Sequence, residues 1–145
     1  MELGLKNKSA LVLASSSGLG KAIAMELARE GARVMLCGRS EEQLKRAQQD
    51  ILNATGNEPK YLAGSITDPR YIQELVQTTV EKCGPIFALV NNSGGPKPGP
   101  FDSFDDQAWQ DAYELCLLSY IRTIRAVLPH MRANGGGRIL CSTSS

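Results

Sequence analysis

The stretch Ala10–Gly20 (Ala-Leu-Val-Leu-Ala-Ser-Ser-Ser-Gly-Leu-Gly) restricts the fold of this chain more than any other part of the sequence. Its first half, Ala10–Ala14, is an apolar run long enough for one buried strand, and Ser15–Gly18 are small residues suited to a tight turn. Apolar residues then recur at the spacing of one helix face, at Leu19, Ile23 and Leu27. A strand that turns abruptly into a helix leaves the first N–H groups of the helix unpaired, and these groups favour a bound phosphate. The stretch therefore predicts a nucleotide-binding turn.

Two other glycine motifs do not fit this stretch. A P-loop needs a glycine five positions before Gly20 and a Ser or Thr two positions after it, where the chain has Ser15 and Ala22. A nucleophile elbow needs a serine flanked as Gly-x-Ser-x-Gly, and no serine of the stretch is flanked in that way. An ordinary strand–helix turn without a ligand remains the alternative at this point.

Composition predicts one soluble domain over residues 1–145, since 42% of the 145 residues are hydrophobic and 21% are charged. The formal net charge is +1 and no basic run exists, which argues against nucleic acid as a partner. The apolar run Leu11–Leu13 is too short for a signal or membrane-spanning segment. We therefore expect a cytoplasmic protein that does not bind a membrane.

Cysteine and histidine usage argues against a metal site. The four cysteines are far apart and form no Cys-x-x-Cys pair, as is typical of reduced thiols in a cytosolic chain: Cys37, Cys83, Cys116 and Cys141. His130 is the only histidine, which leaves almost no material for a zinc site or a Ser–His catalytic pair. We expect no metal ligand set.

Strand and helix patterns alternate along the whole chain. Strands are expected at Ala10–Ala14, Arg33–Cys37, Lys60–Ala63, Ile86–Val90 and Arg138–Cys141. Helices are expected after Leu19, Ser40 and Asp68, with one long helix from about Asp105 to Arg132. Right-handed crossovers force such a chain into an α/β fold, a Rossmann-type doubly wound parallel sheet with strand order 3-2-1-4-5, incomplete at its C-terminal side. Ligands then bind beyond the carboxyl ends of strands 1 and 4.

The end of the second strand is informative about the cofactor. An acidic residue there holds a ribose 2′-hydroxyl and favours NAD, whereas an arginine accommodates a 2′-phosphate. The chain has Gly38 and Arg39 at this place, and the planar guanidinium of arginine binds phosphate in a fork geometry. The sequence therefore favours NADP (NADPH) over NAD, with a solvated surface arginine as the alternative.

These features together resemble the short-chain dehydrogenase/reductase family, and within it the 3-oxoacyl-acyl-carrier-protein-reductase-like members, over all 145 residues. The family's Thr-Gly-x-x-x-Gly-x-Gly turn falls on Leu13–Gly20, and its Asn-Asn-Ala-Gly falls on Asn91–Gly94. Its strand-5 motif Gly-Arg-Ile-Val-Asn-Ile-Ser-Ser falls on Gly137–Ser144. The resemblance implies hydride transfer between NADPH and a carbonyl or alcohol substrate, with Ser144 as the catalytic serine. It implies cofactor contacts at Ser15, Ser17, Gly18, Leu19, Gly20, Arg39, Ser65, Ile66, Asn91 and Gly94.

The chain departs from the family at several places. Ala14 replaces the first motif glycine, and Ser65 replaces the aspartate expected to hold the adenine. Cys116 stands where the family has its active-site Asn, and a thiol is a poor hydrogen-bond donor. The family's Tyr-x-x-x-Lys has no counterpart, because no tyrosine here is followed by lysine four residues later: Tyr61, Tyr71, Tyr113 and Tyr120. All four are expected to be packing or surface residues.

Two functional hypotheses follow. The first is an NADP(H)-binding N-terminal portion of an oxidoreductase, inactive as the 145-residue chain, which would meet a small carbonyl substrate only when completed. The alternative is a non-catalytic dinucleotide-binding or partner-binding module. One face of Ile86–Val90 and Ile139–Cys141 is expected to lack a helix, and an open apolar strand edge is a template for another chain. We therefore also expect a homo-oligomer, with a solvated carboxyl end as the alternative.

Overall fold

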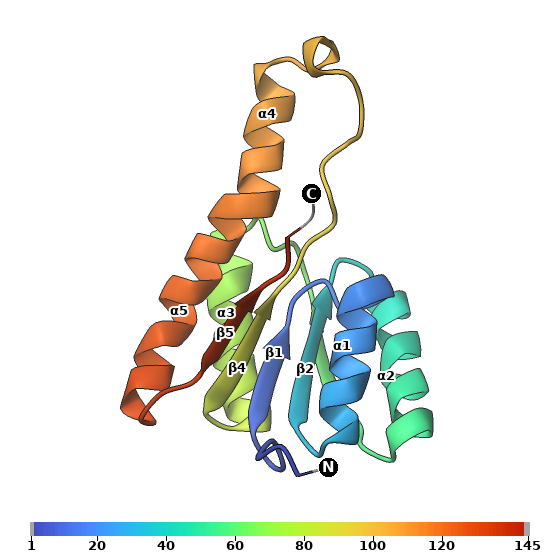
Figure 1. Cartoon of the computed structure of the whole chain (residues 1–145), viewed down its shortest axis with the longest axis vertical. Helices are drawn as coiled ribbons and strands as arrows, with labels where there is room; N and C mark the ends of the chain where they lie inside the picture. The colour runs from blue at the N-terminus through green and yellow to red at the C-terminus, as the bar shows by residue number, and fades with distance from the viewer. Residues whose placement is uncertain (1, 144–145) are drawn as a thin grey trace.

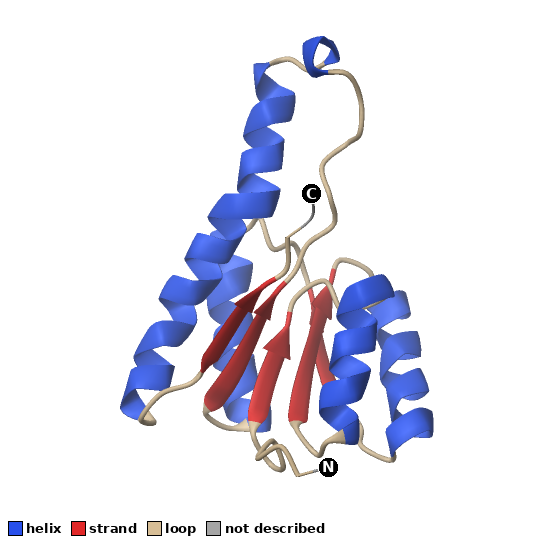
Figure 2. Ribbon diagram, viewed as in Figure 1, coloured by secondary structure: helices blue, strands red, loops and turns tan. Residues whose placement is uncertain are grey.

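The computed structural model describes residues 2–143 as one parallel sheet with helices on both faces (Figure 1). The strands are β1 (Ser9–Val12), β2 (Arg33–Gly38), β3 (Lys60–Ala63), β4 (Ile86–Asn91) and β5 (Arg138–Cys141). The helices are α1 (Gly18–Arg29), α2 (Glu41–Thr55), α3 (Pro69–Cys83), α4 (Asp106–Tyr113) and α5 (Ser119–Ala133). The strand order β3-β2-β1-β4-β5, with every pair parallel, confirms the predicted topology (Figure 2).

Two apolar clusters fill the space between the sheet and its helices. Val12 and Leu36 face the layer formed by α1 and α2, whereas Leu11 and Leu89 face the layer formed by α3 and α5. Neighbouring residues of β1 thus point to opposite faces, as the strand period requires. The continuous apolar runs of β1 and β4 therefore reflect burial on both sides.

The buried face of α1 is offset from the apolar stripe that the sequence shows. Sequence spacing pointed to Leu19, Ile23 and Leu27, but the fully buried residues of α1 are Gly20, Ala24 and Ala28. Leu19 is 58% exposed. The reason is the close approach of the helix to the turn before it, where a Cβ at Gly20 would overlap the carbonyl oxygen of Ala14. Small residues let α1 lie against the sheet, and the larger ones are displaced to the sides.

The turn between β1 and α1 is held by a buried serine. β1 ends at Val12 rather than at Ala14, and Ala14 has a left-handed φ of 49°, which is uncommon for a residue with a Cβ. The hydroxyl of Ser15 donates to the Val12 carbonyl at 2.7 Å and accepts from the Cys37 amide at 3.0 Å. These bonds fix the turn to the ends of both β1 and β2.

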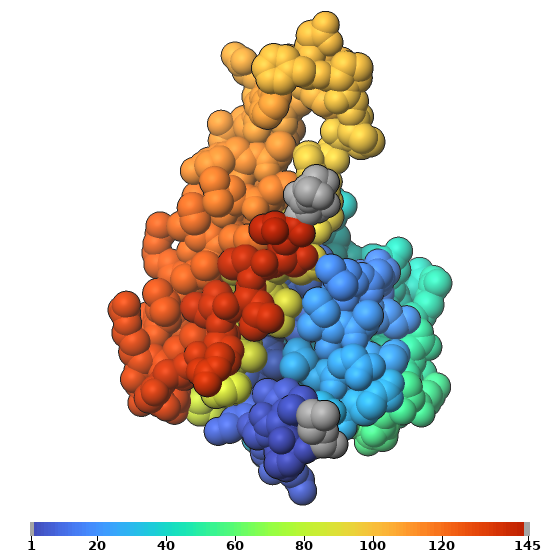
Figure 3. Space-filling model, viewed as in Figure 1, coloured from blue at the N-terminus to red at the C-terminus, as the bar shows by residue number. Residues whose placement is uncertain are grey.

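The predicted long helix consists of three segments. α4 is followed by one π-turn, Glu114–Leu118, and then by α5, which runs one residue past the predicted end. α4 contains no buried residue, and with the preceding residues 96–105 it forms an arm that rises above the sheet (Figure 3). On this arm Trp109 is 51% exposed and contacts the ring of Phe101 at a centroid distance of 5.4 Å.

β5 is one of the two edge strands of the sheet as described, and all four of its residues are exposed. Ile139 is paired with Leu89 and Leu140 with Val90, so both strand faces are apolar. Leu140, on the side of α1 and α2, is 56% exposed. Among residues 2–143, no helix combines the length and apolar character needed to cross a bilayer.

Candidate functional site

A cleft of about 1600 Å³ opens at the carboxyl edge of the sheet. Its walls come from the segments that follow all five strands and from one side of the α4–α5 segment. Lining residues from the strand loops include Ser16, Ser17, Arg39, Ser65, Ile66, Asn92 and Gly94. Those from the helical wall are Ala112, Cys116, Leu117, Tyr120, Ile121 and Ile124. The cleft lies where the strand order reverses, between β1 and β4, as predicted for a ligand site in such a sheet.

The N-terminus of α1 opens onto this cleft without a side-chain cap. In α2, α3 and α4, the first turn is capped by the side chains of Ser40, Asp68 and Asp105, which accept backbone N–H groups. At α1 the equivalent residue, Ser17, makes no such bond, and no acidic residue lies in the first turn. The first N–H groups of a 12-residue helix are therefore left for a partner of another kind, and an anion is the partner they favour.

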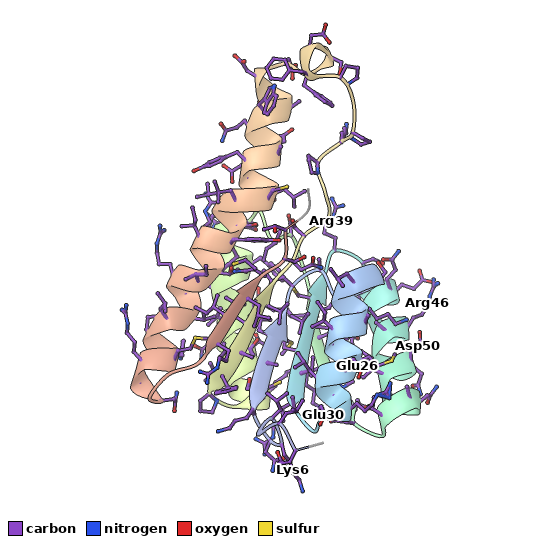
Figure 4. The ribbon with its side chains drawn as sticks, viewed as in Figure 1. Lys6, Glu26, Glu30, Arg39, Arg46 and Asp50 are labelled. Atoms are coloured by element: carbon purple, nitrogen blue, oxygen red, sulfur yellow. The ribbon has the colours of Figure 1, made fainter. Side chains whose placement is uncertain are left out.

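Arg39 gives the cleft its charge. Among the described residues that line the cleft, Arg39 is the one charged side chain, and no Asp or Glu accompanies it. Figure 4 shows Arg39 at the carboxyl edge of the sheet, far from Arg46 and Asp50 on the outer side of α2. A Cβ added at Gly38 would lie 3.1 Å from the Ser16 hydroxyl oxygen, so an acidic side chain at Gly38 would crowd the β1–α1 turn. The electrostatics of this end of the cleft favour an anion.

The structure brings most of the predicted cofactor residues to the cleft. Its described lining includes Ser17, Leu19, Arg39, Ser65, Ile66 and Gly94. Gly18 and Gly20 lie at the start of α1, where Gly18 has a φ of 57° and open space around its Cα. Ser144, predicted as the catalytic serine, lies outside the described residues.

Two of the predicted cofactor residues have buried side chains and do not belong to the described lining of the cleft. Ser15 is fully buried in the turn. Asn91 is also fully buried; it accepts from the Thr123 hydroxyl at 2.7 Å and lies 3.7 Å from the Cys141 sulfur. Its neighbour Asn92 does line the cleft. The side chains of Ser15 and Asn91 therefore hold strand ends together.

Sequence reasoning placed Cys116 at the family's active-site position, but it missed the other residues of the helical wall. Tyr120 was expected to be a packing or surface residue, yet it lines the cleft, and its hydroxyl donates to the Ser142 carbonyl at 3.1 Å. The signal was the four-residue spacing of Ala112, Cys116, Tyr120 and Ile124, but this stripe would drift around a regular α-helix. Ser16 and Asn92 were also missed, because the sequence does not show which of two adjacent residues points outward.

The thiols fall into two groups. Cys116 and Cys141 line the cleft and are partly or largely exposed. Burial raises the pKa of the Cys37 thiol to about 11, and burial likewise raises the pKa of Cys83. Cys37 also borders the cleft but is buried, so Cys116 and Cys141 are the accessible thiols there. Within residues 2–143, no three His, Cys, Asp or Glu side chains gather as metal ligands.

Comparison with known proteins agrees with this architecture. The model of the family described as short chain dehydrogenase matches residues 8–145, and the chain belongs to that family. The chain spans about half the length of the curated relatives it matches.

Three solved structures illustrate the similarity. L-Sorbose reductase from Gluconobacter frateurii, in complex with NADPH and L-sorbose, superposes with a TM-score of 0.91 at 32% identity, covering 97% of this chain and 54% of that chain. An actinorhodin polyketide ketoreductase with NADPH gives a TM-score of 0.88 at 34% identity, with the same coverage. A 7alpha-hydroxysteroid dehydrogenase complexed with NADH and 7-oxo glycochenodeoxycholic acid gives 0.91 at 32% identity, again covering 97% and 54%.

Proposed function

We propose that this chain binds NADP(H) in the cleft and forms the dinucleotide-binding part of a carbonyl reductase. The observation that carries the proposal is the position of Arg39. It is the one charged side chain among the described lining residues, in the same cleft as the uncapped N-terminus of α1. Two anion-favouring elements without a competing carboxylate fit a dinucleotide with an additional phosphate.

The residues present fit the adenosine and pyrophosphate portions of such a group. The backbone N–H groups of Ser17–Leu19 would bind the pyrophosphate, for which the open space around Gly18 leaves room. Arg39 would bind the 2′-phosphate, with the neighbouring hydroxyls of Ser16 and Ser40 as further donors. Ser65 and Ile66 would contact the adenine.

The family resemblance supplies the proposed reaction class. When bound, the cofactor supplies a hydride for a carbonyl carbon or accepts one from an alcohol. The helical wall presents apolar groups from Ala112, Leu117 and Ile121, which suits a substrate with an apolar chain. We propose a 3-oxoacyl-like carbonyl compound as the substrate class of the complete protein. NADH in one related structure and NADPH in two show that the family alone does not select the cofactor.

Replacing Arg39 by Ala tests the cofactor preference. We expect the parent chain to bind NADPH more tightly than NADH. Arg39→Ala should weaken NADPH binding by about 1–3 kcal/mol, the value of a lost charged hydrogen bond, and leave NADH binding almost unchanged. Isothermal titration calorimetry with both cofactors measures these differences.

The matched control is Arg46→Ala, which removes an exposed arginine paired with Glu42 on α2, outside the cleft. It should leave both affinities as in the parent chain. Equal affinities of the parent chain for NADPH and NADH would refute the cofactor preference.

We further propose that the 145-residue chain does not catalyse carbonyl reduction by itself. A general acid must reach the carbonyl oxygen with a proton to donate. The tyrosine on the cleft wall, Tyr120, donates its hydroxyl hydrogen to the Ser142 carbonyl, and no lysine follows it at the family's spacing. Cys116 supplies a thiol where the family has an amide. With Tyr120 already bonded and a thiol at position 116, we expect this chain to bind the cofactor without catalysing hydride transfer.

NADPH oxidation by the purified chain should therefore stay at buffer background with a broad panel of aldehydes, ketones and 3-oxoacyl thioesters. Cofactor binding must be demonstrated in the same sample, so that an absence of NADPH oxidation is not mistaken for the effect of unfolding. The expectation fails if turnover is proportional to chain concentration and is weakened by Arg39→Ala but not by Arg46→Ala.

The exposed strand β5 supports a homo-oligomer of this chain. Its unpaired edge and the half-exposed Leu140 present both hydrogen-bonding groups and apolar surface. Static light scattering at micromolar concentration should give at least a dimer mass, and Ile139→Lys should reduce it. Gln49→Lys, on the exposed side of α2, adds the same charge and should have no effect. A monomer mass for the parent chain, unchanged in Ile139→Lys, would contradict this proposal.

A further inference from the structure

The π-turn Glu114–Leu118 is built around one buried hydroxyl. In a regular α-helix the Ser119 amide would donate to the Leu115 carbonyl. Here it donates to the Glu114 carbonyl instead, one residue further back. The Ser119 hydroxyl donates to the Leu115 carbonyl at 2.6 Å, in place of the amide, and Ser119 is fully buried. The hydroxyl thus satisfies the carbonyl that the wider turn would otherwise leave without its amide partner.

A second interaction clamps the same turn from outside. Arg122 Nη1 lies 3.0 Å from Glu114 Oε2, and both side chains are largely shielded, at 24% and 30% exposure. The same nitrogen donates to the Thr67 carbonyl at 3.5 Å. Thr67 follows Ser65 and Ile66, which line the cleft. Arg122 therefore connects the π-turn to the loop after β3.

The wider turn keeps one stripe of residues on the cleft wall. Four residues of a regular α-helix exceed a full turn by about 40°, so a four-residue stripe drifts sideways along the helix. A π-turn holds more residues per turn and offsets this drift. Four residues at this spacing all line the cleft: Ala112, Cys116, Tyr120 and Ile124. Because α4 has no buried residue, its own packing does little to set its rotation.

We propose that Ser119 is a positioning residue whose hydroxyl holds the π-turn and so keeps Cys116 on the cleft wall, with Arg122 as a second clamp. Removal of the hydroxyl favours the regular helix, in which the amide at position 119 returns to the Leu115 carbonyl. Cys116 then turns away from the side shared by the exposed Leu117 and Ile121. This inference does not depend on NADP(H) binding, and its test uses no cofactor.

The test measures the hydrogen-bond register and the thiol together in the 145-residue chain. Long-range HNCO spectra detect scalar coupling across N–H···O=C bonds. In the parent chain the amide at position 119 should couple to the Glu114 carbonyl, and in Ser119→Ala it should couple to the Leu115 carbonyl. In a Cys141→Ser background, alkylation of Cys116 by iodoacetamide should slow by about fivefold in Ser119→Ala, the factor expected for one hydrogen bond.

Thr79→Val is the matched control. The Thr79 hydroxyl donates to the Leu75 carbonyl at 2.6 Å, also four residues back and fully buried, but in the regular helix α3. Its loss should lower stability without changing either the coupling at position 119 or the alkylation rate of Cys116. The inference is overturned if the amide at position 119 in Ser119→Ala still couples to the Glu114 carbonyl. It is also overturned if Thr79→Val slows the alkylation of Cys116 as much as Ser119→Ala does.

Arg122→Met provides an independent variant should Ser119→Ala fail to fold. It keeps the buried hydroxyl and removes the clamp on Glu114 and Thr67. We expect slower alkylation of Cys116 and weaker coupling to the Glu114 carbonyl. Parent-like values of both measurements in Arg122→Met would exclude the clamp.

Discussion

The close contact between the start of α1 and the β1–α1 turn controls the geometry of the candidate site. A Cβ at Gly20 would overlap the Ala14 carbonyl oxygen, and Ala14 itself adopts a left-handed φ of 49°. Together these two residues let α1 begin in close contact with the turn that follows β1. Because α1 is held there, its uncapped N–H groups open at the carboxyl edge of the sheet, where the loops after the other strands also end.

Buried and half-buried polar side chains hold those loops in place. Ser15 connects the turn to Cys37 at the end of β2, and Asn92 reaches the Ala14 carbonyl at 3.5 Å from the loop after β4. Asn91 bonds Thr123 of α5 and so joins the sheet to the helical wall. Since buried polar groups are costly to leave unpaired, these bonds fix the relative positions of the strand ends.

The sequence was sufficient for the features that depend on local pattern. β5 and the caps at Ser40 and Asp68 were predicted correctly, because periodicity and capping are local. The strand order was also correct, because right-handed crossovers restrict an alternating strand–helix chain to few topologies. The apolar spacing in α1 did not reveal that Leu19 is exposed, because close approach to the turn requires small residues on the buried face. Alternation along a loop likewise could not show which of Asn91 and Asn92 points into the cleft. The π-turn escaped detection because it rests on a hydroxyl–carbonyl bond that a continuous helical pattern does not reveal.

Chemical-shift mapping of a labelled sample with NADPH tests the central claim most directly. NADPH is titrated into the ¹⁵N-labelled chain, and backbone amide shifts are followed by heteronuclear correlation spectra. We expect the largest changes at Ser16–Leu19, at Arg39 and Ser40, and at Ser65 and Ile66, all on one edge of the sheet. Saturable binding with changes confined to the opposite edge, or no change at millimolar NADPH in a folded sample, would contradict a dinucleotide site in this cleft.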